Sequence, residues 1–201
     1  MKIGVSLFLL LCVGQLAWAG NQQEEALADP VRLALARAVT DHSPPTPPFT
    51  DTAARLQYLA WLGEMSGRLK KNPHLADHKT RVEFLSTAWY EAKRAGLDPA
   101  LLLGLIQVES GFRKYAVSTA GAQGYMQVMP FWSRVIGDGD AARLLQMQTN
   151  LRYGCSILRM YIEMEKGDLF MALGRYNGSR GRPEYPKAVM AALKKWEFHQ
   201  P

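Results

Sequence analysis

The sequence predicts a mainly α protein with at most a small β-hairpin. Over most of the chain, apolar residues recur at the three- and four-residue spacing of helices that bury one face. Several of these stretches follow an aspartate or an Asp-Pro pair, a typical helix start with proline at the first helical position. Only residues 111–129 break the helical period, because their glycines together with Val117, Tyr125 and Val128 favour short strands.

The first nineteen residues have the pattern of a secretory signal peptide. Lys2 is followed by an apolar run over residues 3–14, and Ala17-Trp18-Ala19 forms an A-x-A cleavage pattern before Gly20. The run is too short to span a membrane, so we expect cleavage rather than an uncleaved anchor. Cys12 follows leucines, whereas a lipoprotein signal requires a small residue before its cysteine. We therefore expect no stable membrane insertion of the mature chain.

We expect three parts along the chain. Residues 1–19 are the signal peptide, residues 20–49 an N-terminal helical arm with a proline-rich spacer, and residues 50–201 the main domain with leading helices. The arm's helix begins at Asp29-Pro30, and the prolines of residues 44–48 favour an extended spacer.

The main domain is expected to be built from helices. They are predicted over residues 51–70, 79–95 and 98–110, and they resume around Ala141, Asn150, Asp168 and Lys187 after a segment ended by Pro130. The apolar side of the first is expected to hold Leu56, Leu59, Trp61, Leu62 and Leu69, and that of the last Val189, Met190, Leu193 and Trp196.

Charge and cysteine content narrow the function classes. The formal net charge of +6 falls to +5 once Lys2 leaves, which favours an acidic polymer as partner. Because the positive residues are scattered and form no basic helix face, we expect no nucleic-acid binding. The mature chain keeps only Cys155, which follows the spacing of an apolar helix face and is expected to be packed in the core.

Glu109 is the strongest candidate for a catalytic residue. It stands near the end of the run LLLGLIQVES, which is otherwise almost wholly apolar and is therefore expected to be buried. Burial raises the pKa of a carboxyl group, and a glutamic acid that is still protonated near neutral pH can donate its proton to a leaving oxygen. The alternatives are a salt-bridged structural glutamate and a helix end in solvent.

Two further blocks follow Glu109 and give the chain a family resemblance. They are Tyr125-Met126-Gln127-Val128-Met129-Pro130, after a glycine-bearing loop, and Arg175-Tyr176-Asn177-Gly178. With the Glu-Ser pair, their order and spacing resemble the soluble lytic transglycosylase (SLT) family over residues 80–196. The resemblance implies a goose-type-lysozyme-like helical domain. Tyr125 and Arg175 depart from that family's usual leucine and alanine.

The resemblance also implies roles for individual residues. Glu109 would be the catalytic acid, and Ser118, Gln127, Tyr176 and Asn177 would bind substrate. Each binding residue keeps a structural alternative. Ser118 could form only a loop turn, Gln127 needs hydrogen-bond partners wherever it is buried, and Tyr176 and Asn177 could simply end a helix.

No metal or organic cofactor is expected. His74 and His78 lack a third ligand with zinc spacing, and Asp138-Gly139-Asp140 lacks the bidentate glutamate of a calcium loop. A turn followed by a helix cap at Asp140 accounts better for the latter.

The resemblance implies a peptidoglycan lytic transglycosylase, periplasmic or secreted, that acts on glycan strands. It would cleave the β-1,4 bond between N-acetylmuramic acid (MurNAc) and N-acetylglucosamine (GlcNAc) with a single glutamate and leave 1,6-anhydroMurNAc. The alternatives are a goose-type lysozyme-like hydrolase and a non-catalytic peptidoglycan-binding protein, since a fold does not guarantee chemistry.

Overall fold

The computed structural model describes residues 22–40, 47 and 49–199, and these are mainly helical, as the sequence predicts. The signal peptide and most of the proline spacer lie outside the described residues. The helices are α1 (Asp29–Thr40), α2 (Thr52–Leu69), α3 (His78–Arg94), α4 (Pro99–Ser110), α5 (Phe131–Ile136), α6 (Met147–Met164), α7 (Leu169–Asn177) and α8 (Glu184–Leu193), with a 3-10 helix, η1 (Ala141–Leu145), before α6.

Aspartate side chains start most of these helices. Asp51, Asp77, Asp98, Asp140 and Asp168 each accept a hydrogen bond from a backbone N–H in the first turn of the helix that follows. Such a cap satisfies a donor that has no partner within the helix, and its loss costs about 1 kcal/mol. The helix starts are therefore encoded locally.

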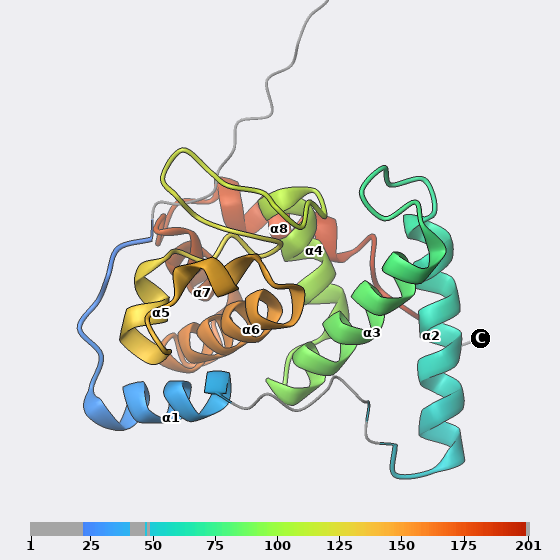
Figure 1. Cartoon of the computed structure of the whole chain (residues 1–201), viewed down its shortest axis with the longest axis horizontal. Helices are drawn as coiled ribbons and strands as arrows, with labels where there is room; N and C mark the ends of the chain where they lie inside the picture. The colour runs from blue at the N-terminus through green and yellow to red at the C-terminus, as the bar shows by residue number, and fades with distance from the viewer. Residues whose placement is uncertain (1–21, 41–46, 48, 200–201) are drawn as a thin grey trace, which may run out of the picture.

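The buried helix α4 lies at the centre of the fold, between α3 and α8 (Figure 1). Gly104 allows α8 to approach it closely, because a Cβ at this position would lie 2.6 Å from the backbone nitrogen of Leu193. Glycine in a helix interior lowers helix stability by up to about 1 kcal/mol relative to alanine, so its presence here has a packing reason. The close approach brings the first turn of α8 beside the last turn of α4.

A buried ion pair joins α3 to α6. The Arg152 guanidinium donates to the Glu91 carboxylate at 2.8 Å, and both side chains are almost fully buried. Arg94 also donates to Glu91 at 3.0 Å. Because removing one partner would leave an uncompensated buried charge, the pair fixes how these two helices meet.

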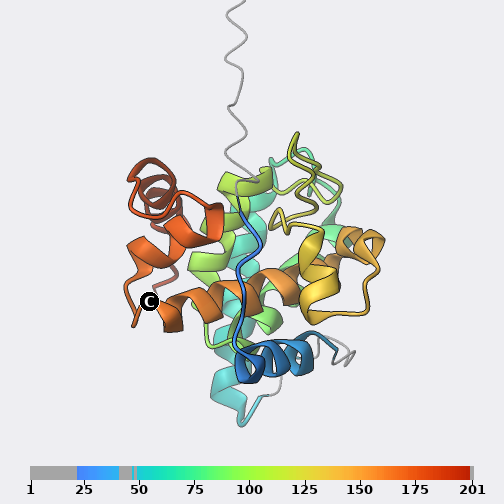
Figure 2. The same cartoon turned by 90° about the vertical axis from the view of Figure 1, so that its left-hand side faces the viewer.

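Residues 22–40, the first that the structure describes, pack onto the main body. Helix α1 packs against α5 and α6, and the segment before it runs up the face of the molecule between α5 and α7 (Figure 2). The Trp132 indole donates to Gln22 Oε1 at 3.0 Å, and Arg175 donates to the Glu25 carboxylate at 2.8 Å. The arm's helix is confirmed, while the domain boundaries remain a prediction.

The long loop between α4 and α5 contains two isolated antiparallel bridges instead of a strand ladder. They pair Gln123 with Val117 and with Val128, and no sheet forms among the described residues. The prediction of at most a small β-hairpin is therefore confirmed.

Two details of the predicted helices are wrong. Leu56 is 60% exposed and Leu59 is 48% exposed, because α2 buries a different face, made of Tyr58, Trp61, Met65 and Leu69. Met190 is 40% exposed, and Trp196 is buried as expected but lies beyond the end of α8. Pro130 ends the loop segment, as expected, and α5 begins directly after it.

Candidate active site

Glu109 lies in the last turn of α4 with its side chain turned into the protein. Only 7% of the residue is exposed, and the Tyr185 hydroxyl donates to its Oε1 at 2.5 Å. Gly111 ends the helix with φ +58°, and Phe112 follows with φ +68°. Two successive left-handed residues, one of them not glycine, turn the chain sharply away just after Glu109.

The carboxyl group is kept neutral by its surroundings. Burial raises the pKa of Glu109 to about 8, and the hydrogen bond from Tyr185 acts in the opposite direction. No basic side chain forms a salt bridge with Glu109 among the described residues. Both structural alternatives considered for this residue, a salt-bridged glutamate and a helix end in solvent, are therefore wrong.

Two buried tyrosines accompany the acid. Burial, and then the nearby Glu109 carboxylate, hold the pKa values of Tyr176 and Tyr185 well above their usual range. The Tyr176 hydroxyl donates to the carbonyl of Met126 at 2.8 Å and so joins α7 to the long loop. Both hydroxyls therefore remain protonated and act as hydrogen-bond donors at neutral pH.

Gln127 organises the loop from within. Its Nε2 donates to the carbonyls of Gly124 at 3.0 Å and Ala116 at 3.1 Å, and its backbone has φ +49°. A non-glycine residue in this left-handed region is uncommon and is often found at functional sites. Both amide protons of Gln127 therefore serve the loop itself.

Ser118 lies in the same loop and closes a turn. Its Oγ accepts a hydrogen bond from the backbone N–H of Ala122 at 3.0 Å. This is the contact that the loop-turn alternative describes.

Asn150, from α6, fixes the loop from the other side. Its side chain accepts from the backbone N–H of Met126 and donates to the carbonyls of Gln123 and Leu144, each at 2.8 Å. Gly124 makes room for this contact, because a Cβ there would collide with the Asn150 amide. The sequence analysis treated Asn150 only as a helix start and missed this role.

Asn177 ends α7, and Gly178 follows in the left-handed conformation, as the helix-end alternative proposes. The Asn177 amide nitrogen donates to Ser179 Oγ at 3.0 Å. Across the described part of the chain, three buried side-chain oxygens accept no hydrogen bond: Glu109 Oε2, Gln123 Oε1 and Asn177 Oδ1. A buried acceptor without a partner costs about 1–3 kcal/mol, which a hydroxyl or amide donor from a ligand would offset.

The two positions that depart from the family pattern have different surroundings. Tyr125 packs against Phe84 with ring centroids 4.8 Å apart, and burial raises its pKa to about 12. Arg175 donates to Glu165 at 2.7 Å and to Glu25, so its side chain is tied to the N-terminal segment.

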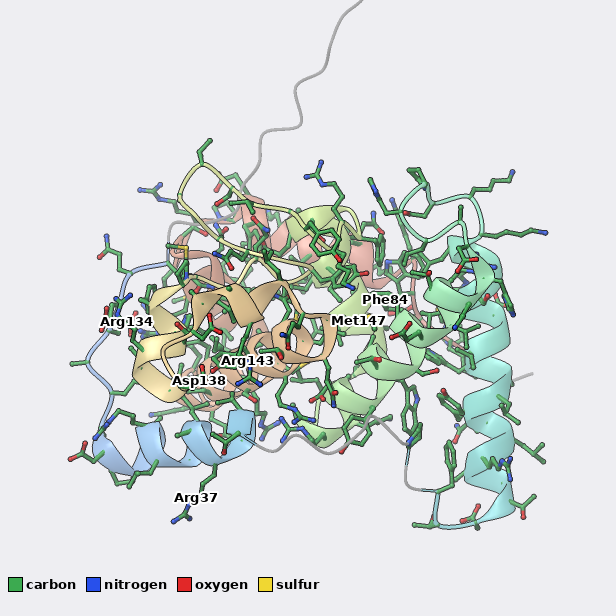
Figure 3. The ribbon with its side chains drawn as sticks, viewed as in Figure 1. Arg37, Phe84, Arg134, Asp138, Arg143 and Met147 are labelled. Atoms are coloured by element: carbon green, nitrogen blue, oxygen red, sulfur yellow. The ribbon has the colours of Figure 1, made fainter. Side chains whose placement is uncertain are left out.

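The carboxylates between Glu109 and Asn177 all have structural partners. Asp138 and Arg143 form an ion pair near α1, and their side chains point toward each other in Figure 3. Asp140 and Asp168 cap η1 and α7. Glu163 pairs with Arg159 at 2.8 Å, and Glu165 accepts from Arg175 and Arg180 at 2.7 Å. Each of these five carboxylates therefore has a structural role.

The side chains that could bind a metal are scattered over the described part of the chain. Among the residues that the structure describes, no three His, Cys, Asp or Glu side chains are placed to share an ion. Cys155 is fully buried, as expected from its helix face.

The family comparison agrees with this geometry. The model of the transglycosylase SLT domain matches residues 86–198, which is more than half of the chain. The chain belongs to the transglycosylase SLT domain family. The SLT segment contains Glu109, the long loop, Tyr176 and Tyr185, whereas α1 and α2 precede it.

Short segments are also similar to curated relatives. A stretch of 39 residues is 59% identical to the membrane-bound lytic murein transglycosylase C of Actinobacillus pleuropneumoniae serotype 5b (strain L20), covering 19% of this chain and 11% of the relative. A stretch of 48 residues is 46% identical to the protein of that name from Mannheimia succiniciproducens, covering 24% and 13%. The counterpart from Glaesserella parasuis serovar 5 is 45% identical over 60 residues, covering 29% and 16%. The chain thus spans less than a fifth of the length of these relatives.

Tyr185, like Asn150, has a role that the sequence pattern does not predict. It lies on the inward side of α8 with Val189 and Ala192, at a spacing that is also typical of simple core packing. The available signal was the need of a buried carboxyl group for a hydrogen-bond donor, which a tyrosine on an inward helix face can supply.

Proposed function

We propose that this chain is a lytic transglycosylase that cleaves the β-1,4 bond between MurNAc and GlcNAc in peptidoglycan. The observation that carries the proposal is the state of Glu109: a buried carboxyl group with a pKa of about 8. Such a group is protonated at neutral pH, as a general acid must be before it acts. Membership of the SLT domain family supports this chemistry, and the short matched segments are similar to lytic murein transglycosylases.

In the proposed reaction, Glu109 donates its proton to the glycosidic oxygen while the bond from that oxygen to the MurNAc anomeric carbon breaks. The resulting carboxylate then accepts the proton of the MurNAc C6 hydroxyl as its oxygen attacks the anomeric carbon. The acid is restored, no water is consumed, and the new chain end is a 1,6-anhydro ring. Tyr185 orients the carboxyl group through Oε1, which leaves Oε2, an oxygen without a partner among the described residues, to carry the proton that is transferred.

The hydrolase alternative would require a second carboxylate, as most glycosidases have. It lies about 5–5.5 Å from the acid as nucleophile, or about 6.5–9.5 Å away as the base that activates water. Because each carboxylate between Glu109 and Asn177 is already a helix cap or an ion-pair partner, intramolecular attack by the C6 hydroxyl is favoured. An intramolecular nucleophile also has a large proximity advantage over water.

We assign the substrate contacts to the long loop between α4 and α5 and to the end of α7. Asn177 Oδ1 and Gln123 Oε1 are buried acceptors without a partner among the described residues, so they suit sugar hydroxyl or acetamido donors. Ser118 stays a candidate contact of the loop, while Gln127 and Tyr176 shape the site by holding that loop. No metal or organic cofactor is required.

We place the protein in the bacterial cell envelope. The signal-peptide pattern of residues 1–19 supports export, and no helix in the described part of the chain is long and apolar enough to cross a membrane. Residues 50–201 would form the catalytic domain, and α1 of the preceding arm packs against it.

The test uses purified sacculi. The wild-type protein should release soluble muropeptides. Glu109→Gln should still bind sacculi but should release muropeptides at least about a hundredfold more slowly, because it has no transferable proton. Glu163→Gln, a change at an exposed ion pair, is the matched control and should keep wild-type activity. Sedimentation of the wild type with sacculi without release would establish a binding protein, and near-normal release by Glu109→Gln would remove the acid from its role.

A further inference from the structure

A cavity of about 450 Å³ lies at the other end of α4 from Glu109. It is enclosed by the start of α2, the first turn of α4 and the segment that follows α8, which lies beside α2 (Figure 1). Pro99 lines this cavity and Glu109 lies ten residues later on the same helix, so the two are about 15 Å apart along the axis. The cavity is therefore separate from the acid.

Six aromatic side chains contribute to its wall. They belong to Phe49, Tyr58, Trp61, Trp89, Trp196 and Phe198. Six aromatic side chains around one cavity supply flat apolar faces on several sides, a feature typical of small-molecule sites of this size.

Long-range contacts hold these rings in place. Tyr58 packs against Phe49 and Trp89 with ring centroids 5.1 and 4.9 Å apart, and its hydroxyl bonds to Ser86 Oγ at 2.9 Å. The Trp196 indole donates to Gln107 Oε1 at 2.9 Å. The wall is thus formed before any ligand arrives, which lowers the ordering cost of binding.

The polar groups at the cavity have mixed charge. Gln57, Lys93, Asp98, Glu197 and His199 line it together with the rings. Lys93 Nζ lies 5.9 Å from the centre of the Trp89 ring, where it competes with a cationic ligand for that face. Asp98 and Glu197 disfavour an anion. The lining therefore fits a neutral ligand that has apolar faces and many hydrogen-bonding groups.

We propose that this cavity binds an N-acetylated saccharide, a stretch of glycan strand remote from the bond that is cut. A pyranose ring presents C–H groups on its faces and hydroxyl or acetamido groups at its edge, which matches aromatic walls with polar side chains beside them. The identity of the saccharide rests on the proposed function. Phe49, Tyr58 and Trp61 precede the segment that matches the SLT family, whereas the other lining aromatic residues lie within it, so the cavity lies where the leading residues meet the SLT segment.

A second hold on the same polymer would keep the protein at the glycan between cuts. When one site is occupied, binding at the other becomes intramolecular and proceeds at a high effective concentration. The protein should then dissociate from sacculi more slowly than the affinity of the active site alone implies.

The test is a titration of ¹⁵N-labelled protein, purified after export and carrying Glu109→Gln, with chitotetraose. The indole N–H signals of Trp61 and Trp89 should shift saturably. The Trp132 signal should stay in place, because that indole is bonded to Gln22 in the core far from the cavity, and it also reports that each variant is folded. Amide signals of the loop at Gly124 and Met126 report binding at the active site independently.

Ala54→Phe is the decisive variant, because Ala54 lines the cavity and a larger side chain would fill it. It should weaken the Trp61 and Trp89 response at least tenfold and leave the loop response unchanged. Ala53→Phe, at the exposed neighbouring position, is the matched control and should behave as the parent. Loop shifts without indole shifts, or equal indole shifts in Ala54→Phe, would overturn the cavity proposal alone. Indole shifts without loop shifts would support it and count against the proposed active site.

Discussion

Replacing Glu109 with glutamine should make the folded protein more stable at neutral pH. In the unfolded chain this carboxyl group has its usual pKa of 4.5, whereas burial raises the pKa to about 8 in the folded protein. Between these values the unfolded state releases the proton and the folded state retains it, so stability is full below pH 4.5 and is lost as pH rises toward 8. Glutamine resembles the neutral acid and does not titrate.

The size of the effect follows from the same two values. Each pH unit within this window costs roughly 1.4 kcal/mol, so about 3 kcal/mol of stability is lost between pH 4.5 and pH 7. This is a large part of the total stability of a domain. The measurement is the free energy of unfolding in urea for both proteins at the two pH values, because titrations that they share cancel in the difference.

The advantage of Glu109→Gln over the wild type should therefore grow by about 3 kcal/mol between the two pH values. Glu163→Gln, which removes an exposed carboxylate, should change stability by less than about 0.5 kcal/mol at either pH. A difference between Glu109→Gln and wild type that is the same at both pH values would mean that Glu109 ionises normally in the folded protein. The reasoning about a protonated acid would then fail.

Three further predictions test the surroundings of the acid and the export of the chain. Tyr185→Phe removes the hydrogen bond that lowers the pKa of Glu109, so the basic limb of a pH–rate profile on sacculi should move to higher pH. Turnover at pH 7 should nevertheless fall about tenfold, because the carboxyl group is no longer oriented through Oε1; an unchanged profile would mean that Tyr185 is only a packing residue. Asp138→Asn and Asp140→Asn should each keep turnover within about tenfold of wild type, since both residues have framework roles, and a collapse in either would support a hydrolase. Protein from the cell envelope should begin at Gly20 by mass spectrometry or Edman sequencing, and a chain that begins at Met1 would refute cleavage.

Local signals in the sequence predict most helix starts correctly. Asp98 followed by proline predicts the start of α4, and Asp140 predicts that of η1, because a side-chain cap depends only on neighbouring residues. The glycine-bearing loop is recognisable from its broken period for the same reason. Helix faces are less certain: Leu56 and Leu59 have helical spacing, but α2 buries the side that carries the larger aromatic residues.

The site depends on contacts that no local pattern encodes. Tyr185 reaches Glu109 across 76 positions of the chain, and it does so because Gly104 lets α8 approach α4. Asn150 holds the loop at Met126 from a helix 24 residues later. The apolar run is enough to make Glu109 the candidate acid, but partners that meet only through tertiary packing cannot be predicted from the sequence.

The chemical form of the cleaved glycan tests the central proposal most directly. Muropeptides released from sacculi by the wild-type protein can be separated and measured by mass spectrometry. We expect products that end in 1,6-anhydroMurNAc, lighter by one water than hydrolytic products and without a reducing end. Products that predominantly carry a reducing MurNAc end would contradict the transglycosylase proposal and establish a hydrolase.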